Sequence, residues 1–295
     1  MKVTNKYNLP EPFVKAVERH EHRRGVFSVT QLLKGSTEIA LEMLHADEME
    51  MDVSDMFNML LGTAVHKVLE ESGRDWWCKY EHYMEVKSFA GLTVSGTADV
   101  INEMDGEIID YKTCSSWKIV FKDFDDWREQ IKSYLYLYHM IYDNENDPSR
   151  DMLNGKIVAI IKDFSQTEAQ RNPDYPQKPI ITIPFSYTYE EIMAVGERWY
   201  DKIRDVLRKV ATGDVGSCSE TERWAKPAKY ALMKEGRKSA VKLYDTEDEC
   251  KAAVEENGKG YYLEYRKGED TKCDKYCVAG KCGLCPYKNG KEATC

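Results

Sequence analysis

The stretch GEIIDYKTCSSWK, residues 106–118, places an aspartate and a lysine two residues apart inside an otherwise apolar run. Side chains alternate along a β-strand, so Asp110 and Lys112 share one face while Ile109 and Tyr111 point to the other. Taken alone, this pattern is most often a solvated sheet face that carries a surface ion pair. The rest of the chain decides between this interpretation and a functional one.

Two further strands are predicted just before this stretch. The segments EHYMEVKSF (81–89) and LTVSGTADVI (92–101) have strand composition, and short connections join all three strands into an antiparallel meander. Asp99 lies in the middle strand, next to the strand that holds Asp110. We therefore expect the two carboxylates to come within the distance at which they can share a metal ion.

A long helix is predicted over residues 54–71. Apolar residues recur there at the spacing of one buried helix face: Phe57, Leu60, Leu61, Ala64, Val65 and Val68. His66 lies about 160° from the centre of this face on a helical wheel, so it is not a core histidine. Without further context it is a solvent-facing residue.

A second helix is predicted after the meander. It begins at Asp126, with Glu129 three residues on as a capping box, and it ends near Asp143. Gln130 and Tyr134 are four residues apart and therefore lie on one face of this helix.

Further strands are expected at residues 156–164 and 179–187. Thr188 and Glu191 cap a third long helix, which stops before Gly213. The chain then becomes basic, with a short helix at about 246–257, a strand at 260–266 and a cysteine-dense end.

These elements predict three parts of the chain. Residues 1–53 form an N-terminal helical segment, 54–213 a core, and 214–295 a basic appendage. The chain has 295 residues, 42% of them hydrophobic, and no apolar run approaches the ~18 residues that a membrane span needs.

Composition also limits the location and the class of protein. The first residues lack an apolar signal segment, so we expect a cytoplasmic protein whose nine cysteines are reduced rather than paired in disulfides. A net charge of -9 argues against a nonspecific nucleic-acid coat protein. The motif G-x-x-x-x-G-K is absent, so we expect no nucleotide and no helicase motor in this chain.

One region runs against the acidic average. Residues 223–242 hold seven Lys or Arg and one Glu, with Trp224 and Tyr230 among them. Such a run is most often a solvated face, but a surface that follows a phosphate backbone has the same composition. The candidate phosphate contacts are Lys226, Lys229, Arg237 and Lys238.

Four segments follow one another on the predicted helix, strand, strand and helix, in this order: GTAVH (62–66), GTADVI (96–101), DYKT (110–113) and QIKSYLYLY (130–138). Together they resemble the RecB-like branch of the PD-(D/E)XK nuclease superfamily, over roughly residues 55–140. The resemblance implies an α/β, restriction-endonuclease-like core, a mixed sheet flanked by helices in the order αβββαβ. The whole chain also resembles nuclease-like proteins of tailed bacteriophages, which implies a phage-encoded protein in a bacterial cell.

The resemblance also implies roles for particular residues. Asp99 and Asp110 would be carboxylate ligands of Mg²⁺ or Mn²⁺, with His66 as an additional ligand and the carbonyl of Ile109 or Tyr111 completing the shell. Lys112 would orient or deprotonate the attacking water. Gln130 and Tyr134 would support the DNA strand or Lys112.

The implied activity is metal-dependent hydrolysis of phosphodiester bonds in DNA, by an exonuclease acting on free ends in recombination, replication or repair. A separate recombination or helicase protein is a further expected partner. The alternative is a noncatalytic nucleic-acid-binding or inhibitory protein that kept the fold. The sequence leaves exo or endo action, polarity, DNA or RNA, and oligomeric state open.

The cysteine-dense end predicts a second metal site. Cys273, Cys277, Cys282 and Cys285 fall within thirteen residues, a clustering that inert thiols would rarely show. Several RecB-like nucleases hold a [4Fe-4S] cluster with one cysteine before the core, but no cysteine precedes His66 here. Cys218 with Cys273, Cys277 and Cys285 would substitute, which we favour. The alternative is Zn²⁺ on the four contiguous cysteines, with Cys282 among the ligands.

Overall fold

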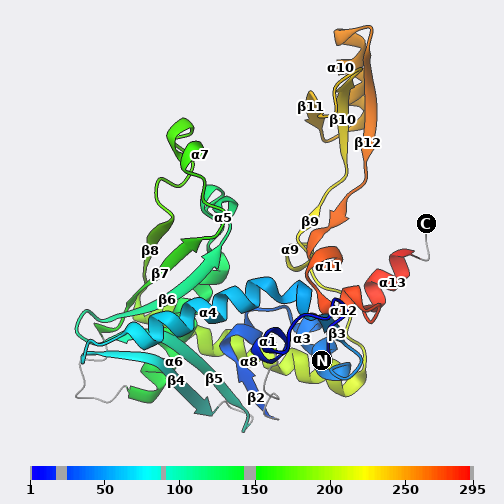
Figure 1. Ribbon diagram of the computed structural model, residues 1–295. Coiled ribbons are helices and arrows are strands. Elements are labelled where there is room, and N and C mark those ends of the chain that lie inside the picture. The colour runs from blue at the N-terminus through cyan, green and yellow to red at the C-terminus, as the bar shows by residue number, and fades with distance from the viewer. Residues whose placement is uncertain (1, 18–24, 88–90, 143–150, 293–295) are drawn as a thin grey trace.

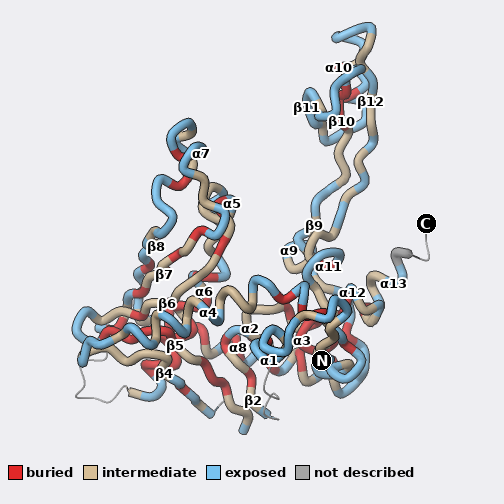
Figure 2. Tube along the Cα trace, in the orientation of Figure 1, coloured by how far each residue is buried: buried red, intermediate tan, exposed pale blue. Residues whose placement is uncertain are grey.

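The computed structural model describes residues 2–17, 25–87, 91–142 and 151–292. Its body combines a mixed β-sheet with helices, and an arm formed by β10, β11, β12 and α10 projects from it (Figure 1). Buried residues concentrate in the body, whereas the arm is mostly exposed (Figure 2). None of the helices in the described ranges has both the length and the apolar character that a membrane crossing requires.

The predicted meander is present. The strands β4, β5 and β6 pair antiparallel in sequence, β7 lies parallel to β6, β8 lies antiparallel to β7, and β2 lies parallel to β5. Their bounds are β2 (Val26–Ser28), β4 (Cys78–Lys87), β5 (Thr93–Asn102), β6 (Glu107–Cys114), β7 (Asn154–Ile161) and β8 (Ile180–Ser186).

The two edges of strand β5 differ in how much of their length is paired with other strands. The strand β4 pairs with β5 along the whole of one edge except at Asp99. On the other edge, β2 pairs with residues 93–95 and β6 pairs with residues 100–102. Among the described residues, positions 96–99 therefore have no strand neighbour on that edge. The sheet opens there, and the opening includes Asp99.

Three long helices flank the sheet: α4 (Phe57–Ser72), α6 (Asp125–Tyr142) and α8 (Tyr189–Thr212). A 3₁₀ turn, η1 (Val53–Met56), leads into α4. Helix α4 contacts β6, α6 crosses β4 to β7, and α8 packs on α6. The buried residues of α8 recur every three or four positions, which is the spacing of one helix face: Ile192, Val195, Trp199, Ile203 and Val206.

The predicted ends of these helices are partly confirmed. Thr188 and Glu191 form the capping box at the start of α8, and Gly213 ends it with a φ of 72°. The predicted start of α6 is wrong by one residue, because the helix already includes Asp125. Glu129 does not complete a capping box there; its carboxylate instead pairs with lysine and arginine side chains. Asp143, the predicted end, lies outside the described residues.

The N-terminal residues contribute strands as well as helices. Strand β1 (Lys2–Thr4) pairs with β3 (Glu50–Asp52), and β2 joins the main sheet. The helices are α1 (Glu11–Val17), α2 (Val29–Leu32) and α3 (Ser36–Leu44).

The C-terminal end packs back onto α3. Leu41 shares a small core with Val215, Ala279 and Cys285. The short helices of this end are α11 (Thr271–Lys275), α12 (Val278–Lys281) and α13 (Pro286–Glu292).

The arm lies between Cys218 and Cys273 in the chain. It leaves the body after α9 (Glu220–Arg223), through β9 (Ala225–Lys226), which pairs with the returning β13 (Glu269–Asp270). Its outer part is a three-stranded sheet with one helix and a small core of its own. These elements are β10 (Lys229–Lys234), β11 (Lys242–Tyr244), α10 (Glu247–Asn257) and β12 (Tyr261–Arg266).

Candidate active site

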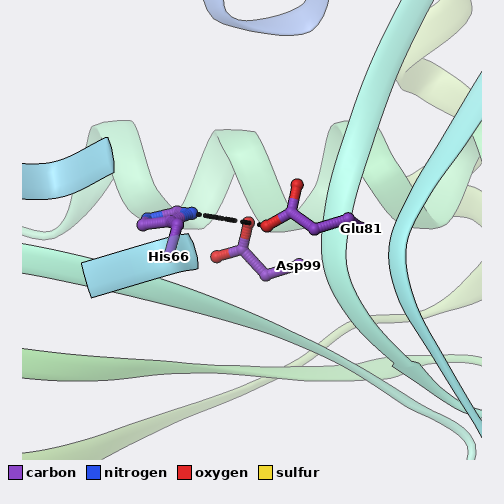
Figure 3. Close-up of side chains that lie close together, drawn as sticks. All are labelled: His66, Glu81 and Asp99. Carbon is purple, nitrogen blue, oxygen red and sulfur yellow. Dashed lines mark ion pairs between the residues drawn. The ribbon is translucent and has the colours of Figure 1, made fainter. Parts of the chain in front are cut away.

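Three metal-binding side chains converge from one helix and two strands (Figure 3). His66 comes from α4, Glu81 from β4 and Asp99 from β5. The Nδ1 atom of His66 lies 3.1 Å from Asp99 Oδ1 and 3.7 Å from Glu81 Oε1. One ligand atom from each residue lies within 4.8 Å of the other two. We call these three residues the acidic centre.

Asp99 is held by the backbone of β6 at the point where the sheet opens. The ladder between β5 and β6 ends at the pair Val100–Ile109. The next amide on β6 that points towards β5 belongs to Tyr111, and it donates to Asp99 Oδ2 at 2.6 Å. The carboxylate thus replaces a carbonyl that β5 no longer supplies. The Tyr111 carbonyl in turn accepts a hydrogen bond from His66 Nε2 at 3.0 Å.

Asp110 and Lys112 form an ion pair that is buried at its acidic end. Asp110 is only 1% exposed, and its Oδ2 lies 2.6 Å from Lys112 Nζ. The interpretation of these residues as a solvated surface pair is therefore wrong. Burial raises the pKa of the Asp110 carboxyl to about 6, against the opposing charge of Lys112.

Two residues of α6 support Asp110 from the core. Gln130 Nε2 lies 3.3 Å from Asp110 Oδ1 and 2.9 Å from the hydroxyl of Tyr134. Both α6 residues are buried, and burial raises the pKa of Tyr134 well above its ordinary range. Gly96 allows this contact, because a Cβ atom there would lie 2.8 Å from the Tyr134 ring. The glycine of GTADVI thus makes room for the tyrosine of the later motif.

Sequence reasoning missed Glu81. The ladder between β4 and β5 pairs Tyr80 with Val100 and His82 with Ala98, and it omits the intervening pair of Glu81 and Asp99. Glu81 has a φ of 45°, a left-handed conformation that is rare outside glycine and is often found at functional sites. The hairpin register could have identified Glu81 from the sequence. The residue numbers of paired positions in this ladder sum to a constant, and that constant places Glu81 opposite Asp99.

The electrostatics of the acidic centre suit a bound cation. The hydrogen bond between His66 and Asp99 raises the pKa of His66 above its ordinary value. Burial together with the Asp99 charge raises the pKa of Glu81. Asp110 Oδ2 is buried, and the Lys112 ammonium lies 2.6 Å from it. Carboxylate oxygens and an imidazole nitrogen fit Mg²⁺ or Mn²⁺.

A cleft of about 460 Å³ opens the acidic centre to solvent along α4. It is lined by residues from one side of that helix and by Glu81: Asn58, Met59, Gly62, Thr63, His66, Lys67, Glu70 and Glu81. The described residues thus provide an open path from solvent to the His66 imidazole.

The fold brings Cys218 close to three of the C-terminal cysteines. The pKa of the Cys218 thiol is raised to about 12, chiefly by burial and to a smaller extent by Glu222 and the thiols of Cys273, Cys285 and Cys277. Cys282 points elsewhere, because its Sγ lies 3.7 Å from the carbonyl of Glu50. Among the described residues, no three sulfur atoms lie within 4.8 Å of one another.

The basic residues of the arm fall into two groups. Lys226 pairs with Glu269 at 3.3 Å, and Lys229 pairs with Asp245. Arg237 and Lys238 lie in the exposed connection between β10 and β11. Arg237 Nε donates to Ser239 Oγ at 3.0 Å, and within the described ranges neither residue forms an ion pair.

Comparison with known proteins gives structural neighbours only. No protein-family model and no curated protein matches the chain. The similar solved structures include the following three. The protein SSO0001 has 18% identity and a TM-score of 0.46 and covers 67% of this chain and 84% of its own. An alkaline exonuclease (LHK-Exo) from Laribacter hongkongensis has 10% identity and a TM-score of 0.40, with 69% and 95% covered. A phage-related exonuclease from Haemophilus somnus 129PT has 14% identity and a TM-score of 0.37, with 60% and 83% covered.

The four sequence motifs lie on α4, β5, β6 and α6 in that order. Their side chains His66, Asp99, Asp110 and Gln130 meet around one acidic centre and the buried ion pair beside it. The structure thus places these motifs on the helix, strand, strand and helix that the sequence predicts for them.

Proposed function

We propose that the protein is a metal-dependent deoxyribonuclease that hydrolyses phosphodiester bonds, acting as an exonuclease in DNA recombination, replication or repair. The observation that carries the proposal is the buried Asp110–Lys112 pair beside the acidic centre. Hydrolysis of a phosphodiester requires neutralised charge at the phosphate, a positioned water and a stabilised leaving oxygen. The site has groups for each of these tasks.

The ligands of Mg²⁺ or Mn²⁺ would be His66 Nδ1 and the carboxylates of Glu81, Asp99 and Asp110. The ion supplies Lewis-acid activation of the phosphate and of the attacking water. His66 is oriented for this role, because its other ring nitrogen donates to the Tyr111 carbonyl. In this arrangement that carbonyl orients His66, and it could serve as the proposed further ligand only by giving up this hydrogen bond.

Lys112 has the role of positioning the water and the scissile phosphate. Its ammonium lies 2.6 Å from the Asp110 carboxylate at the edge of the acidic centre, where its positive charge suits an electrostatic role. Gln130 fixes Asp110 Oδ1, and Asp110 Oδ2 pairs with Lys112. Tyr134 in turn fixes Gln130 and acts as a positioning residue.

The alternative is a nucleic-acid-binding or inhibitory protein without catalysis. Burying the Asp110 carboxylate costs stability, and a left-handed Glu81 adds backbone strain. A binding module has no use for either cost, so the arrangement favours the enzyme.

The deciding experiment is a time course on end-labelled linear DNA and on circular DNA with Mg²⁺, Mn²⁺ or EDTA. An exonuclease shortens the linear substrate, leaves the circular DNA intact and is inactive in EDTA. Cleavage of the circle would mean endonuclease action. Binding of DNA without any cleavage under all metal conditions would support the noncatalytic alternative.

We further propose a [4Fe-4S] cluster held by Cys218, Cys273, Cys277 and Cys285. A tetrahedral zinc site with Zn–S bonds of about 2.3 Å would place its sulfur atoms roughly 3.8 Å apart. Among the described residues no three sulfur atoms lie within 4.8 Å of one another, so the arrangement is not that of a closed zinc tetrahedron, which supports the larger cluster. Cys282 lies against the Glu50 carbonyl, which supports its exclusion from the ligand set.

The proposed DNA contact on the arm involves chiefly Arg237 and Lys238, because carboxylates already pair with Lys226 and Lys229. A separate recombination or helicase protein would supply strand separation, since the chain has no nucleotide-binding motif. We propose that the protein is phage-encoded and acts in the cytoplasm of a bacterial cell.

A further inference from the structure

Helix α5 (Ser116–Val120) presents two aromatic rings to solvent close to the candidate active site. Trp117 is 61% exposed and Phe121 is 72% exposed. Their rings are stacked, with centroids 5.5 Å apart and planes inclined by 21°. Large aromatic side chains rarely stand this open, and here two of them share one helix face.

The helix that carries these rings is firmly anchored on its other side. Ser116 donates to Asp163 from both its amide, at 2.6 Å, and its hydroxyl, at 3.3 Å. Lys118 pairs with Asp126 at 2.7 Å and lies over the buried Trp127 ring. These contacts hold α5 against the start of α6. The stacked rings are therefore presented in a fixed position and do not belong to a loose surface turn.

A series of contacts links α5 to one end of the cleft that leads from the acidic centre. That cleft ends at Asn58, which is about 12 Å along α4 from His66. Asn58 accepts a hydrogen bond from Lys162, whose amide donates to the Cys114 carbonyl at 3.0 Å. Trp117 follows three residues after Cys114. Figure 1 shows α5 and α7 together at the ends of β6 and β7.

Unpaired positive charge accompanies the rings. Lys122 directly follows Phe121, and its φ of 52° turns the chain there. Lys122 and Lys162 are exposed, and within the described ranges neither pairs with a carboxylate. Aromatic faces beside free cations suit a polyanion with flat rings, which is the chemistry of an unpaired nucleic-acid strand.

We propose that Trp117 and Phe121 form a stacking platform for the bases of a single DNA strand that runs along the α4 cleft to the acidic centre. The inference rests on the proposed nuclease function and specifies its substrate as an unpaired strand or a frayed end. Bases in a duplex keep their faces stacked on one another, so only an unpaired base can use the free face of either ring. Lys122 and Lys162 hold the adjoining phosphates.

The test measures binding in EDTA, so that no cleavage is needed. The probes are fluorescein-labelled oligothymidine, longer than a site of about 4–16 nucleotides, and a blunt duplex of equal length. Trp117→Ala should weaken binding of the single strand roughly 5- to 150-fold, the range that follows from stacking on one ring. Duplex affinity should change less than about twofold.

Two variants separate stacking from apolar contact and from misfolding. Trp117→Leu keeps an apolar side chain but no ring, and it should lose most of the affinity that Trp117→Ala loses. Trp117→Tyr keeps an aromatic ring, and its affinity for the single strand should be close to that of the unaltered protein. Tyr7→Ala removes an equally open ring from the N-terminal segment and should leave both affinities unchanged.

Unchanged single-strand affinity in a Trp117→Ala, Phe121→Ala double variant would overturn the platform. So would an equal loss on duplex and single strand. If the same double variant instead lost a protein contact, seen as a change of oligomeric state, the rings would belong to a protein interface. Hydrolysis of bis(p-nitrophenyl) phosphate by the unaltered protein tests the metal chemistry separately, so failure of the nuclease proposal would be seen there.

Discussion

A carboxylate oxygen of Glu81 lies within 4.8 Å of a carboxylate oxygen of Asp99, across the position that the β4–β5 ladder omits. Two like charges this close are unfavourable unless a cation lies between them or one of them takes up a proton. Burial and then the Asp99 charge raise the pKa of Glu81 above its ordinary value. Glu81 is thus as strong a ligand candidate as the residues that the motifs identify.

Replacing Glu81 by glutamine should weaken metal binding. The loss of one charged ligand should raise the Mg²⁺ concentration for half-maximal cleavage about tenfold or more. A magnesium titration of activity measures this shift. Glu85→Gln, on the exposed part of the same strand, is the matched control and should behave as wild type. An unchanged Mg²⁺ requirement would remove Glu81 from the site.

Changes to the buried ion pair should abolish cleavage while the fold persists. Asp110→Asn keeps the shape of a side chain that is 1% exposed, whereas alanine would leave a hole beside Gln130. We expect both Asp110→Asn and Lys112→Ala to lower cleavage by about 10²- to 10³-fold or more. Circular dichroism should show an unchanged fold. Wild-type turnover by either variant would exclude that residue from the chemistry.

Asp52 should contribute stability that disappears in acid. It accepts hydrogen bonds from the Lys6 amide at 2.7 Å, from Thr4 and from Ser54, and these hold its pKa well below the ordinary value of 3.8. Because the folded pKa is the lower one, this contribution is present above about pH 3.8 and is lost as pH falls towards the folded pKa. Asp52→Asn should lower the melting temperature by a few degrees at neutral pH and reduce its fall below pH 4.

Thermal melts between neutral and acid pH measure this difference. Asp47→Asn is the control, because that carboxylate is exposed and forms no hydrogen bond or ion pair within the described ranges. A parallel pH dependence in the Asp52 variant and the unaltered protein would contradict the prediction.

The tip of the arm should bind phosphate. Reversing Arg237 and Lys238 to glutamate should weaken DNA binding and lower its salt slope by about two, since each phosphate contact contributes roughly 0.9. Affinities measured over a range of salt concentrations give the slope. Lys251→Glu, on α10, removes a lysine that already pairs with Glu247 and should have a smaller effect. An unchanged slope in the double variant would restore the solvated-face interpretation.

The cysteine site should fail when any of its four ligands is changed. Cys218→Ser and Cys277→Ser should lose metal and solubility together, because a thiolate site contributes folding free energy directly. Cys282→Ser is the matched control and should retain the metal. Protein purified without oxygen should be brown and contain iron. A colourless protein with one equivalent of zinc that Cys282→Ser abolishes would establish the contiguous four cysteines instead.

Local periodicity predicted most of the body. The strands β4, β5 and β6, the helix α4 and the capping box of α8 follow directly from alternation, helical spacing and cap residues. The short strand β2 could not be predicted in this way, since three residues carry too little pattern. Its pairing with β5 depends on tertiary contact.

The candidate site was likewise predicted from the sequence only in part. Motif order identified His66, Asp99, Asp110 and Lys112, but it could not show that Asp110 is buried, because burial depends on α6 crossing the sheet. Glu81 lies in no motif. Its place depends on strand register, which is a relation between two segments and not a property of either one.

The pairing of β9 with β13 has a consequence for how this protein can vary. The chain leaves the body at Ala225 and returns at Asp270, and these two residues are partners in one short ladder. An inserted unit whose ends meet can be exchanged, shortened or lost without disturbing the surface from which it grows. Residues 227–268 therefore form a unit that can be exchanged as a whole while the candidate active site in the body keeps its geometry.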